Sequence, residues 1–397
     1  MLHCLMPRLD KVIAQIVACC RNIFFCRPQY RKVTLRFPQF QWRKYFHSLK
    51  AIPLFCGMHS WIIRVFIVLG VISTPGAKAQ TQPNFGTGFY HTTEALEFAQ
   101  TVVRGMSFRK QLAQTLMVPS WSREVRADEM LDSQQFQKRL LYQIRECGVG
   151  GIIFFQGNPL SQVYLTNYLQ QESDIPLLIG IDGEWGPAMR LSGMEKYPFQ
   201  MTLGATFNTD LAYQTGLSMG AQCKRMGIHF NFTPSIDVNT EPNNPIIGFR
   251  SFGSNPHNVS IMAAALTRGM QSQGVLASAK HFPGHGDTKT DSHKDLPVVE
   301  KSLTDLLKID IAPFEYLIKE RVASIMVAHL KVRAIDTSSP LPSSISPRYV
   351  SQWLRKDLGY SGLIITDALN MKGVAKIASP ADVAVLALKA GNDIILF

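Results

Sequence analysis

The sequence predicts an α/β fold, a TIM-type (β/α)8 barrel, because residues 80–397 alternate eight short apolar runs with helical stretches. The apolar runs are continuous, which is typical of parallel strands whose two faces are both buried. A doubly wound parallel sheet is the second architecture compatible with alternating strands and helices. The count of eight strands favours the barrel.

The eight strands are expected, in chain order, at residues 116–119, 151–155, 176–182, 229–237, 275–281, 324–329, 362–367 and 393–397. The amphipathic helices expected between them cover residues 134–146, 210–226, 256–273, 302–320 and 347–358. The last helix opens with Ser346-Pro347 and closes at Gly359, which is the usual chemistry of a helix start and a helix end.

The eighth strand runs to the final residue, Phe397, so no residues remain for the helix that follows strand eight in a complete barrel. A barrel without this helix leaves apolar surface of strands eight and one uncovered. We therefore expect the barrel to be truncated within or just after strand eight, and a downstream domain to be missing from this chain.

The net charge of +12 is concentrated at the N-terminal end. Residues 1–57 carry ten Lys and Arg against one acidic residue, whereas residues 80–397 carry 29 Lys and Arg against 28 Asp and Glu. A near-neutral body suits an uncharged substrate, so no nucleic acid is expected as a partner. Residues 1–57 are expected to come from an over-extended reading frame or, alternatively, to be a basic leader outside the mature protein.

Residues 58–79 have the pattern of a secretory signal peptide. Met58 begins a short basic segment, an apolar run follows at residues 65–72, and Ala77-Lys78-Ala79 has small residues at the spacing of a cleavage site. The apolar run is far shorter than the roughly 20 residues of a transmembrane helix, so no stable membrane insertion is expected. We expect cleavage after Ala79 and a periplasmic or secreted location.

Five of the eight apolar runs end in an ionisable side chain, namely Asp182, Asp237, His281, His329 and Asp367. A single terminal Asp indicates little, because Asp is also a common helix cap. In TIM barrels, however, the active site lies at the carboxyl ends of the strands. Five such side chains at corresponding ends predict one polar mouth to the barrel.

The segment at residues 280–293 is rich in His and Asp. His281 and His285 have the i, i+4 spacing of zinc-binding helices, so a metal site is one interpretation. The Pro-Gly pair between them opposes a helix, and Lys280 would place a cation next to the metal. We therefore predict no metal and no cofactor.

The alternative interpretation of this segment is an acid/base pair on a glycine-hinged loop. Asp291 and His293 are two residues apart and can share one side of an extended segment, so that the carboxylate orients and charges the imidazole. A His paired in this way can donate a proton first and accept one afterwards. A surface turn rich in His and Asp is the alternative without a catalytic role.

Four motifs stand out: Lys280-His-Phe-Pro-Gly-His-Gly followed by Asp291-Ser-His293, Asp182-Gly-Glu-Trp-Gly with Arg190, Gly248-Phe-Arg-Ser-Phe-Gly253, and Thr366-Asp-Ala-Leu-Asn-Met371. Over about residues 95–397 the chain resembles glycoside hydrolase family 3, and within it the single-barrel bacterial β-N-acetylhexosaminidases. The Asp-Gly-Glu-Trp-Gly variant resembles a secreted Bacteroidetes-type subgroup, in which the hydrolase often precedes a β-lactamase-like domain. That arrangement agrees with the expected truncation.

The resemblance implies retaining exo-hydrolysis of terminal non-reducing β-linked N-acetylglucosamine. It implies that Asp367 is the nucleophile that forms a covalent glycosyl-enzyme, and that His293, oriented by Asp291, is the general acid and base. Most retaining glycosidases use a carboxylic acid for that second role. The residues it implies as ligands of the terminal sugar are Asp182, Arg190, Arg250, Lys280 and His281.

The partner implied is a small carbohydrate, either an N-acetylglucosamine-terminated oligosaccharide or a peptidoglycan fragment. Three alternatives stay open: phosphorolysis at the same site, β-glucosidase-type specificity, and a catalytically inactive sugar-binding barrel.

Two further interpretations concern single residues. His329 either touches substrate or closes a layer of the barrel, and Phe249 and Phe252 are expected in the core.

Overall fold

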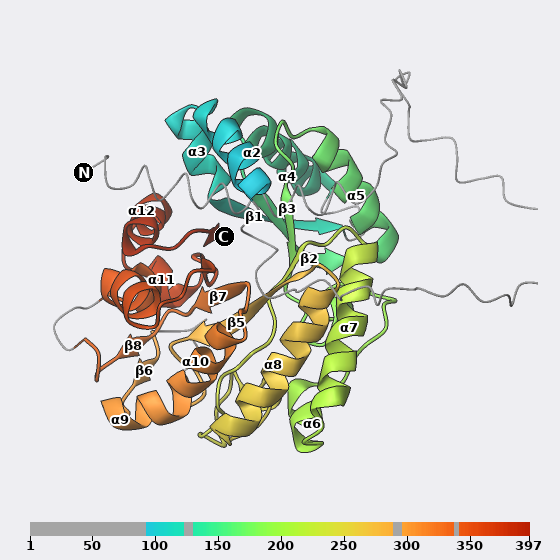
Figure 1. Cartoon of the computed structure of the whole chain (residues 1–397). Helices are drawn as coiled ribbons and strands as arrows, with labels where there is room; N and C mark the ends of the chain where they lie inside the picture. The colour runs from blue at the N-terminus through green and yellow to red at the C-terminus, as the bar shows by residue number, and fades with distance from the viewer. Residues whose placement is uncertain (1–92, 123–129, 289–295, 337–340) are drawn as a thin grey trace, which may run out of the picture. The chain divides into compact units, whose positions relative to one another are not determined.

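The structure is a computed structural model that describes residues 93–122, 130–288, 296–336 and 341–397. Eight parallel strands form a barrel surrounded by helices, so the predicted TIM barrel is confirmed (Figure 1). The barrel strands are β1 (Leu116–Ser122), β2 (Gly151–Gly157), β3 (Leu178–Ile181), β4 (Phe230–Asn231), β5 (Leu276–Phe282), β7 (Ser324–Val327), β9 (Leu363–Thr366) and β10 (Ile395–Leu396). Each strand overlaps one of the eight predicted runs.

The strands pair in the order β10, β1, β2, β3, β4, β5, β7 and β9. A bridge between Ile365 and Ile394 joins β9 to β10, and the amide of Thr366 donates to the carbonyl of Ile394 at 3.1 Å. Strands β6 (Val298–Val299) and β8 (Lys331–Val332) form a separate two-stranded parallel sheet. Because the barrel strands are all parallel, their carboxyl ends meet at one rim.

Helices α2 (Thr93–Arg104) and α3 (Phe108–Gln114) precede the barrel. The later helices are α4 (Met130–Tyr142), α5 (Pro159–Gln171), α6 (Gln200–Ala205), α7 (Thr209–Arg225), α8 (Pro256–Ser272), α9 (Leu303–Asp305), α10 (Ala312–Lys319), α11 (Lys372–Ala375) and α12 (Pro380–Ala390). All five predicted helices are present, but three contain π-helical turns, at Gln143–Cys147, Leu306–Ile311 and Arg348–Asp357. A π-turn adds a residue to the helical repeat, which apolar periodicity does not reveal.

Asn side chains begin three of these helices. Asn158, Asn208 and Asn255 precede α5, α7 and α8, and each carboxamide oxygen accepts a hydrogen bond from the backbone N–H three residues later. This bond satisfies one of the free amides of the first helical turn. Pro follows Asn158 and Asn255, at a position where no N–H donor is needed. The sequence therefore marks these helix starts directly.

Neighbouring side chains of several strands enter separate apolar cores. On β2, Ile152 packs against the outer helices and Ile153 packs inside the barrel, and on β9 the neighbours Ile364 and Ile365 divide in the same way. Burial on both faces explains why the predicted runs are continuously apolar.

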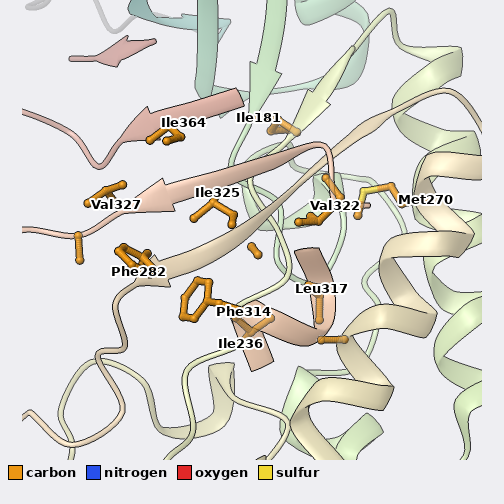
Figure 2. Packing of buried hydrophobic residues seen from close by; sticks show 14 of the residues in the cluster. Ile181, Ile236, Met270, Phe282, Phe314, Leu317, Val322, Ile325, Val327 and Ile364 are labelled. Atoms are coloured by element: carbon orange, nitrogen blue, oxygen red, sulfur yellow. The ribbon is translucent and has the colours of Figure 1, made fainter. Parts of the chain in front are cut away.

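Aromatic rings pack the outer core next to the end of β5. Figure 2 shows Phe282 of β5 beside Phe314 of α10, and these rings meet edge to face with their centroids 5.2 Å apart. Trp353 contacts Phe282 with a centroid distance of 5.2 Å as well. Each such pair contributes about 0.5–1.5 kcal/mol beyond the burial of its area. The rings hold the strand end that carries Lys280 and His281.

The expectation for Phe249 is wrong, whereas that for Phe252 is confirmed. Phe252 is buried, but Phe249 is 50% exposed and lies against the ring of Phe199. Phe249 is the central residue of a short 3₁₀ helix, Gly248–Arg250. Successive side chains of such a turn point about 120° apart, so Phe249 points outward when Arg250 points toward the barrel rim.

Within the described residues, the longest helices, α7 and α8, have 17 residues each, and no helix has both the length and the apolar character needed to cross a membrane. The predicted signal peptide, residues 58–79, and the segment at residues 1–57 lie outside the described residues.

His229 is a buried titratable residue just before β4. Its Nδ1 accepts a hydrogen bond from the backbone N–H of Ile179 on β3 at 3.1 Å. Burial lowers the pKa of His229 from 6.5 to about 4. The folded chain therefore keeps this ring neutral at pH values at which the unfolded chain protonates it.

We predict that His229 destabilises the folded chain by up to about 3 kcal/mol as the pH falls from 7 to 4, because only the unfolded state takes up the proton. His229→Asn keeps an acceptor for the Ile179 N–H but does not titrate, so its unfolding free energy should fall less over this range. Urea denaturation of both proteins at several pH values measures the difference. The same pH dependence in both proteins would contradict the prediction.

Candidate active site

A cavity of about 740 Å³ lies at the carboxyl ends of the barrel strands. Its polar wall consists of Gln156, Asp182, Arg190, Arg250, Lys280, His281, His285, Asp367 and Asn370. Aromatic and aliphatic side chains complete the wall, including Trp121, Phe155, Phe232 and Met326. This size and mixture of surfaces are typical of a small-molecule site. Three of the five side chains of the predicted polar mouth, Asp182, His281 and Asp367, thus line one cavity, whereas Asp237 and His329 do not line it.

Asp182 follows β3 and is held by two cations. Its Oδ1 accepts a hydrogen bond from Nζ of Lys280 at 2.6 Å, and its Oδ2 accepts one from Nη2 of Arg190 at 2.5 Å. The short 3₁₀ helix Pro187–Met189 turns the chain so that Nε of Arg190 also donates to the Asp182 carbonyl at 2.9 Å. Each carboxylate oxygen keeps a second lone pair that can accept a hydroxyl of a ligand.

Glu184 is a second buried carboxylate in the same ion-pair network. Arg250 binds it with two parallel bonds, from Nε to Oε2 at 2.9 Å and from Nη2 to Oε1 at 2.7 Å. Nζ of Lys280 lies 2.8 Å from Oε1. Lys280 is itself buried. Its ammonium group contacts both carboxylates and thereby joins β5 to the loop after β3.

Lys280 and His281 lie in an irregular part of β5. The register between β5 and β7 shifts between Ala279 and Phe282. Consecutive side chains of a regular strand point to opposite faces, whereas a bulge re-aims one of them. Lys280 and His281 both line the cavity as a result. The Lys280–His281 and Phe282–Pro283 peptide bonds are cis.

Asp237 lies behind the cavity wall and holds both His281 and the loop after β5. Its Oδ2 is 2.7 Å from Nδ1 of His281, and its Oδ1 accepts the backbone N–H of His285 at 2.7 Å. The loop also packs closely on the chain after β4, because a Cβ at Gly286 would lie 1.9 Å from the carbonyl oxygen of Val238. Only glycine fits this contact.

Asp367 follows β9 and faces the cavity. Its Oδ1 accepts the N–H of Ala368 at 2.8 Å, and no described residue donates to its Oδ2. His329 lies behind it, with Nδ1 2.7 Å from the Ser344 hydroxyl and Nε2 2.9 Å from the Ala368 carbonyl. Of the two interpretations of His329, the structure favours the structural one, because the ring fixes the backbone next to Asp367.

The family model for the N-terminal domain of glycosyl hydrolase family 3 matches residues 108–397. The chain belongs to glycosyl hydrolase family 3. The resemblance inferred from the four motifs is therefore confirmed at the level of the family.

Two relatives of this chain are named β-hexosaminidases. The β-hexosaminidase A of Pseudoalteromonas piscicida is 36% identical over 271 residues, which are 62% of this chain and 45% of that protein. The β-hexosaminidase of Bordetella avium (strain 197N) is 35% identical over 275 residues, which are 66% of this chain and 76% of that protein. Both are family relatives of moderate identity.

Among solved structures, the family 3 β-N-acetylglucosaminidase of Paenibacillus sp. str. FPU-7 is similar to this chain, with a TM-score of 0.67 and 36% identity. The similarity covers 74% of this chain and 55% of that one. The chain thus spans about half the length of the Pseudoalteromonas and Paenibacillus proteins.

The charges of this family 3 site balance one another. Burial raises the pKa of each carboxyl, but neighbouring cations outweigh it. Lys280 and Arg190 hold the pKa of Asp182 below its ordinary value, and Arg250 and Lys280 do the same for Glu184. The pKa of Asp367 is lowered too, because His281, His329 and the Ala368 N–H outweigh its burial. All three carboxylates are therefore ionised at neutral pH.

The structure brings together six of the eight residues that the family resemblance implies, which are Asp182, Arg190, Arg250, Lys280, His281 and Asp367. The other two, Asp291 and His293, lie outside the described residues. His281 lies in strand β5, so His281 and His285 do not share a helix, as the metal interpretation required. In the part of the chain that the structure describes, no group of three His, Cys, Asp or Glu side chains is arranged to hold a metal ion.

The motifs alone do not assign a role to Glu184, Asp237 or His285. Glu184 stands two residues after Asp182, a spacing that places both carboxylates on one side of an extended segment. Asp237 ends the fourth predicted strand, which signals a position at the rim. Its contact with His281 depends on the register of two strands, and the sequence does not show that register.

Glu184→Gln should lower the free energy of unfolding by about 3–5 kcal/mol, because it leaves Lys280 and Arg250 buried without their shared carboxylate. The matched control is Glu320→Gln, which breaks a more exposed pair with Arg268 and should cost less than about 1 kcal/mol. Urea denaturation at pH 7 compares the two variants with the parent chain. A loss at Glu184 as small as that at Glu320 would contradict the importance of the buried network.

Proposed function

We propose that the chain hydrolyses terminal non-reducing β-linked N-acetylglucosamine with retention of configuration, using Asp367 as nucleophile and His293, oriented by Asp291, as acid and base. The observation that carries the proposal is an ionised Asp367 that shares one cavity with Asp182 and its cations. The names β-hexosaminidase and β-N-acetylglucosaminidase of the relatives support this substrate class.

The proposed reaction has two displacements at the anomeric carbon. In the first, Oδ2 of Asp367 attacks this carbon while His293 gives a proton to the leaving oxygen. In the second, His293 takes a proton from a water molecule, which attacks the same carbon and releases Asp367. Two inversions give net retention. The lowered pKa of Asp367 supports its role, because the nucleophile must be ionised at the start.

The balanced charges of the cavity favour a neutral sugar. Asp182 can accept hydroxyl groups, and Arg190 and Lys280 can donate to ring and hydroxyl oxygens. Glu184 neutralises Arg250, so the wall offers directed hydrogen bonds without a strong positive field. An N-acetylglucosamine-terminated oligosaccharide or a peptidoglycan fragment meets these requirements.

Asp367→Ala should lower kcat for p-nitrophenyl β-N-acetylglucosaminide by roughly 10⁴- to 10⁶-fold, the order expected for loss of a catalytic nucleophile. His293→Ala should lower it by roughly 10²- to 10⁴-fold, as for loss of an acid/base group. Asp174→Ala removes an exposed carboxylate that pairs with Lys110, and should leave kcat unchanged. Full activity of Asp367→Ala would exclude this residue as the nucleophile.

The products separate the proposed reaction from its alternatives. NMR should find the β anomer of N-acetylglucosamine as the first product. Predominance of N-acetylglucosamine 1-phosphate in phosphate buffer would indicate phosphorolysis, and faster turnover of the β-glucoside would indicate β-glucosidase-type specificity. Binding of the sugar without turnover of either substrate would indicate an inactive sugar-binding barrel.

We also propose that the chain is exported through the signal peptide at residues 58–79, which supports a periplasmic or secreted location. N-terminal sequencing of the exported protein should find a mature start at Gln80. A mature protein that retains residue 1 would contradict this proposal.

A further inference from the structure

His285 is a cavity residue that the proposed reaction leaves without a role. It lines the same cavity as Asp182 and Asp367, and only 2% of its surface is exposed. Its ring centroid lies 6.0 Å from that of His281. A buried polar ring on the wall of a ligand cavity is a candidate for a contact with the ligand.

The backbone of His285 is fixed on both sides. Its N–H donates to Oδ1 of Asp237 at 2.7 Å, and its carbonyl accepts Nδ2 of Asn244 at 2.9 Å. The ring is fixed as well, because Nδ1 lies 2.5 Å from the hydroxyl oxygen of Thr288. The side chain is therefore held in one position before any ligand binds.

Nε2 is at the opposite edge of the ring from this contact. It is buried and has no hydrogen-bond partner among the described residues. A buried polar atom of this kind is unfavourable unless a partner satisfies it. A bound ligand can supply that partner, because His285 borders the cavity.

The ring is neutral under ordinary conditions. Burial, followed by the proximity of His281, lowers the pKa of His285 to about 4. Nε2 of a neutral imidazole is either one N–H donor or one lone-pair acceptor. A hydroxyl group both donates and accepts, so it complements either tautomer, whereas an anionic oxygen complements only one.

We propose that His285 is a further sugar-binding residue, whose Nε2 forms a hydrogen bond with a hydroxyl of the terminal N-acetylglucosamine. This inference rests on the proposed function and adds one neutral contact to a wall that also carries several charged groups. Thr288 is the positioning residue of this contact, because its hydroxyl holds the other edge of the ring.

His285→Phe removes both ring nitrogens and keeps a similar side-chain size. It should lower kcat/KM for p-nitrophenyl β-N-acetylglucosaminide by roughly 10- to 100-fold. The midpoint of thermal unfolding should change little, because the variant removes the unpartnered Nε2 together with the contact of Nδ1 with Thr288, and these effects have opposite signs. A lower midpoint with unchanged kcat/KM would show a structural role alone and overturn the proposal.

Deoxygenated substrates test the contact itself. The ratio of kcat/KM between the parent chain and His285→Phe should fall to about 1 for one of the 3-, 4- and 6-deoxy N-acetylglucosaminides, since that substrate lacks the hydroxyl in question. The other two should keep the full ratio. The full ratio with all three would overturn the assignment to a hydroxyl.

Thr288→Val keeps the imidazole and removes the hydroxyl that holds it. It should lower kcat/KM less than His285→Phe and keep the ranking of the deoxy substrates. If His285→Phe does not fold, His285→Leu gives the same test, because Leu also lacks a hydrogen-bonding atom.

Two controls separate this inference from the proposed function. No turnover by the parent chain would contradict the proposed function. Calorimetric titration with N-acetylglucosamine would then test His285 by itself, and equal affinity of parent and His285→Phe would overturn its role. Full turnover by both proteins would overturn the role of His285 and leave the proposed function intact.

Discussion

The buried contact of Lys280 with Asp182 and Glu184 is the interaction on which the rest of the site depends. One ammonium group lies 2.6 Å from the first carboxylate and 2.8 Å from the second. A buried charge without a partner costs several kcal/mol, so burial of each of these three groups depends on burial of the others. Arg190 and Arg250 complete the network from the loops after β3 and β4, and the positions of the sugar-binding candidates are therefore coupled.

Closure of the barrel brings Asp367 to the rim that carries this network. Asp393 accepts the N–H of Ile364 at 2.7 Å and pairs with Arg355, which ties β10 to β9. Asp367 follows β9 three residues after Ile364, so the same closure that completes the sheet brings the candidate nucleophile to the rim. Apolar cores pack against both faces of the strands, and Asp182 and Asp367 directly follow these packed strands.

Much of the fold can be predicted from the sequence because its physical signals are local. Burial on both faces produces eight continuous apolar runs, and Asn followed by Pro marks the starts of α5 and α8. The π-turns leave no such signal. In the site, Asp182, His281 and Asp367 are recognisable because each ends one of the apolar runs predicted to be strands. The pairing of Glu184 with Arg250 is not, because these residues are 66 positions apart and meet only once β3 and β4 have paired.

The central claim is that a sugar held by this network reacts with Asp367 to form a covalent intermediate. Mass spectrometry of the protein after rapid quenching tests it most directly, with a ring-fluorinated N-acetylglucosaminide whose intermediate breaks down slowly. The account predicts a mass increase of one sugar unit, and peptide mapping should locate it on Asp367. An adduct on another residue, or turnover with an inverted product and no adduct, would contradict it.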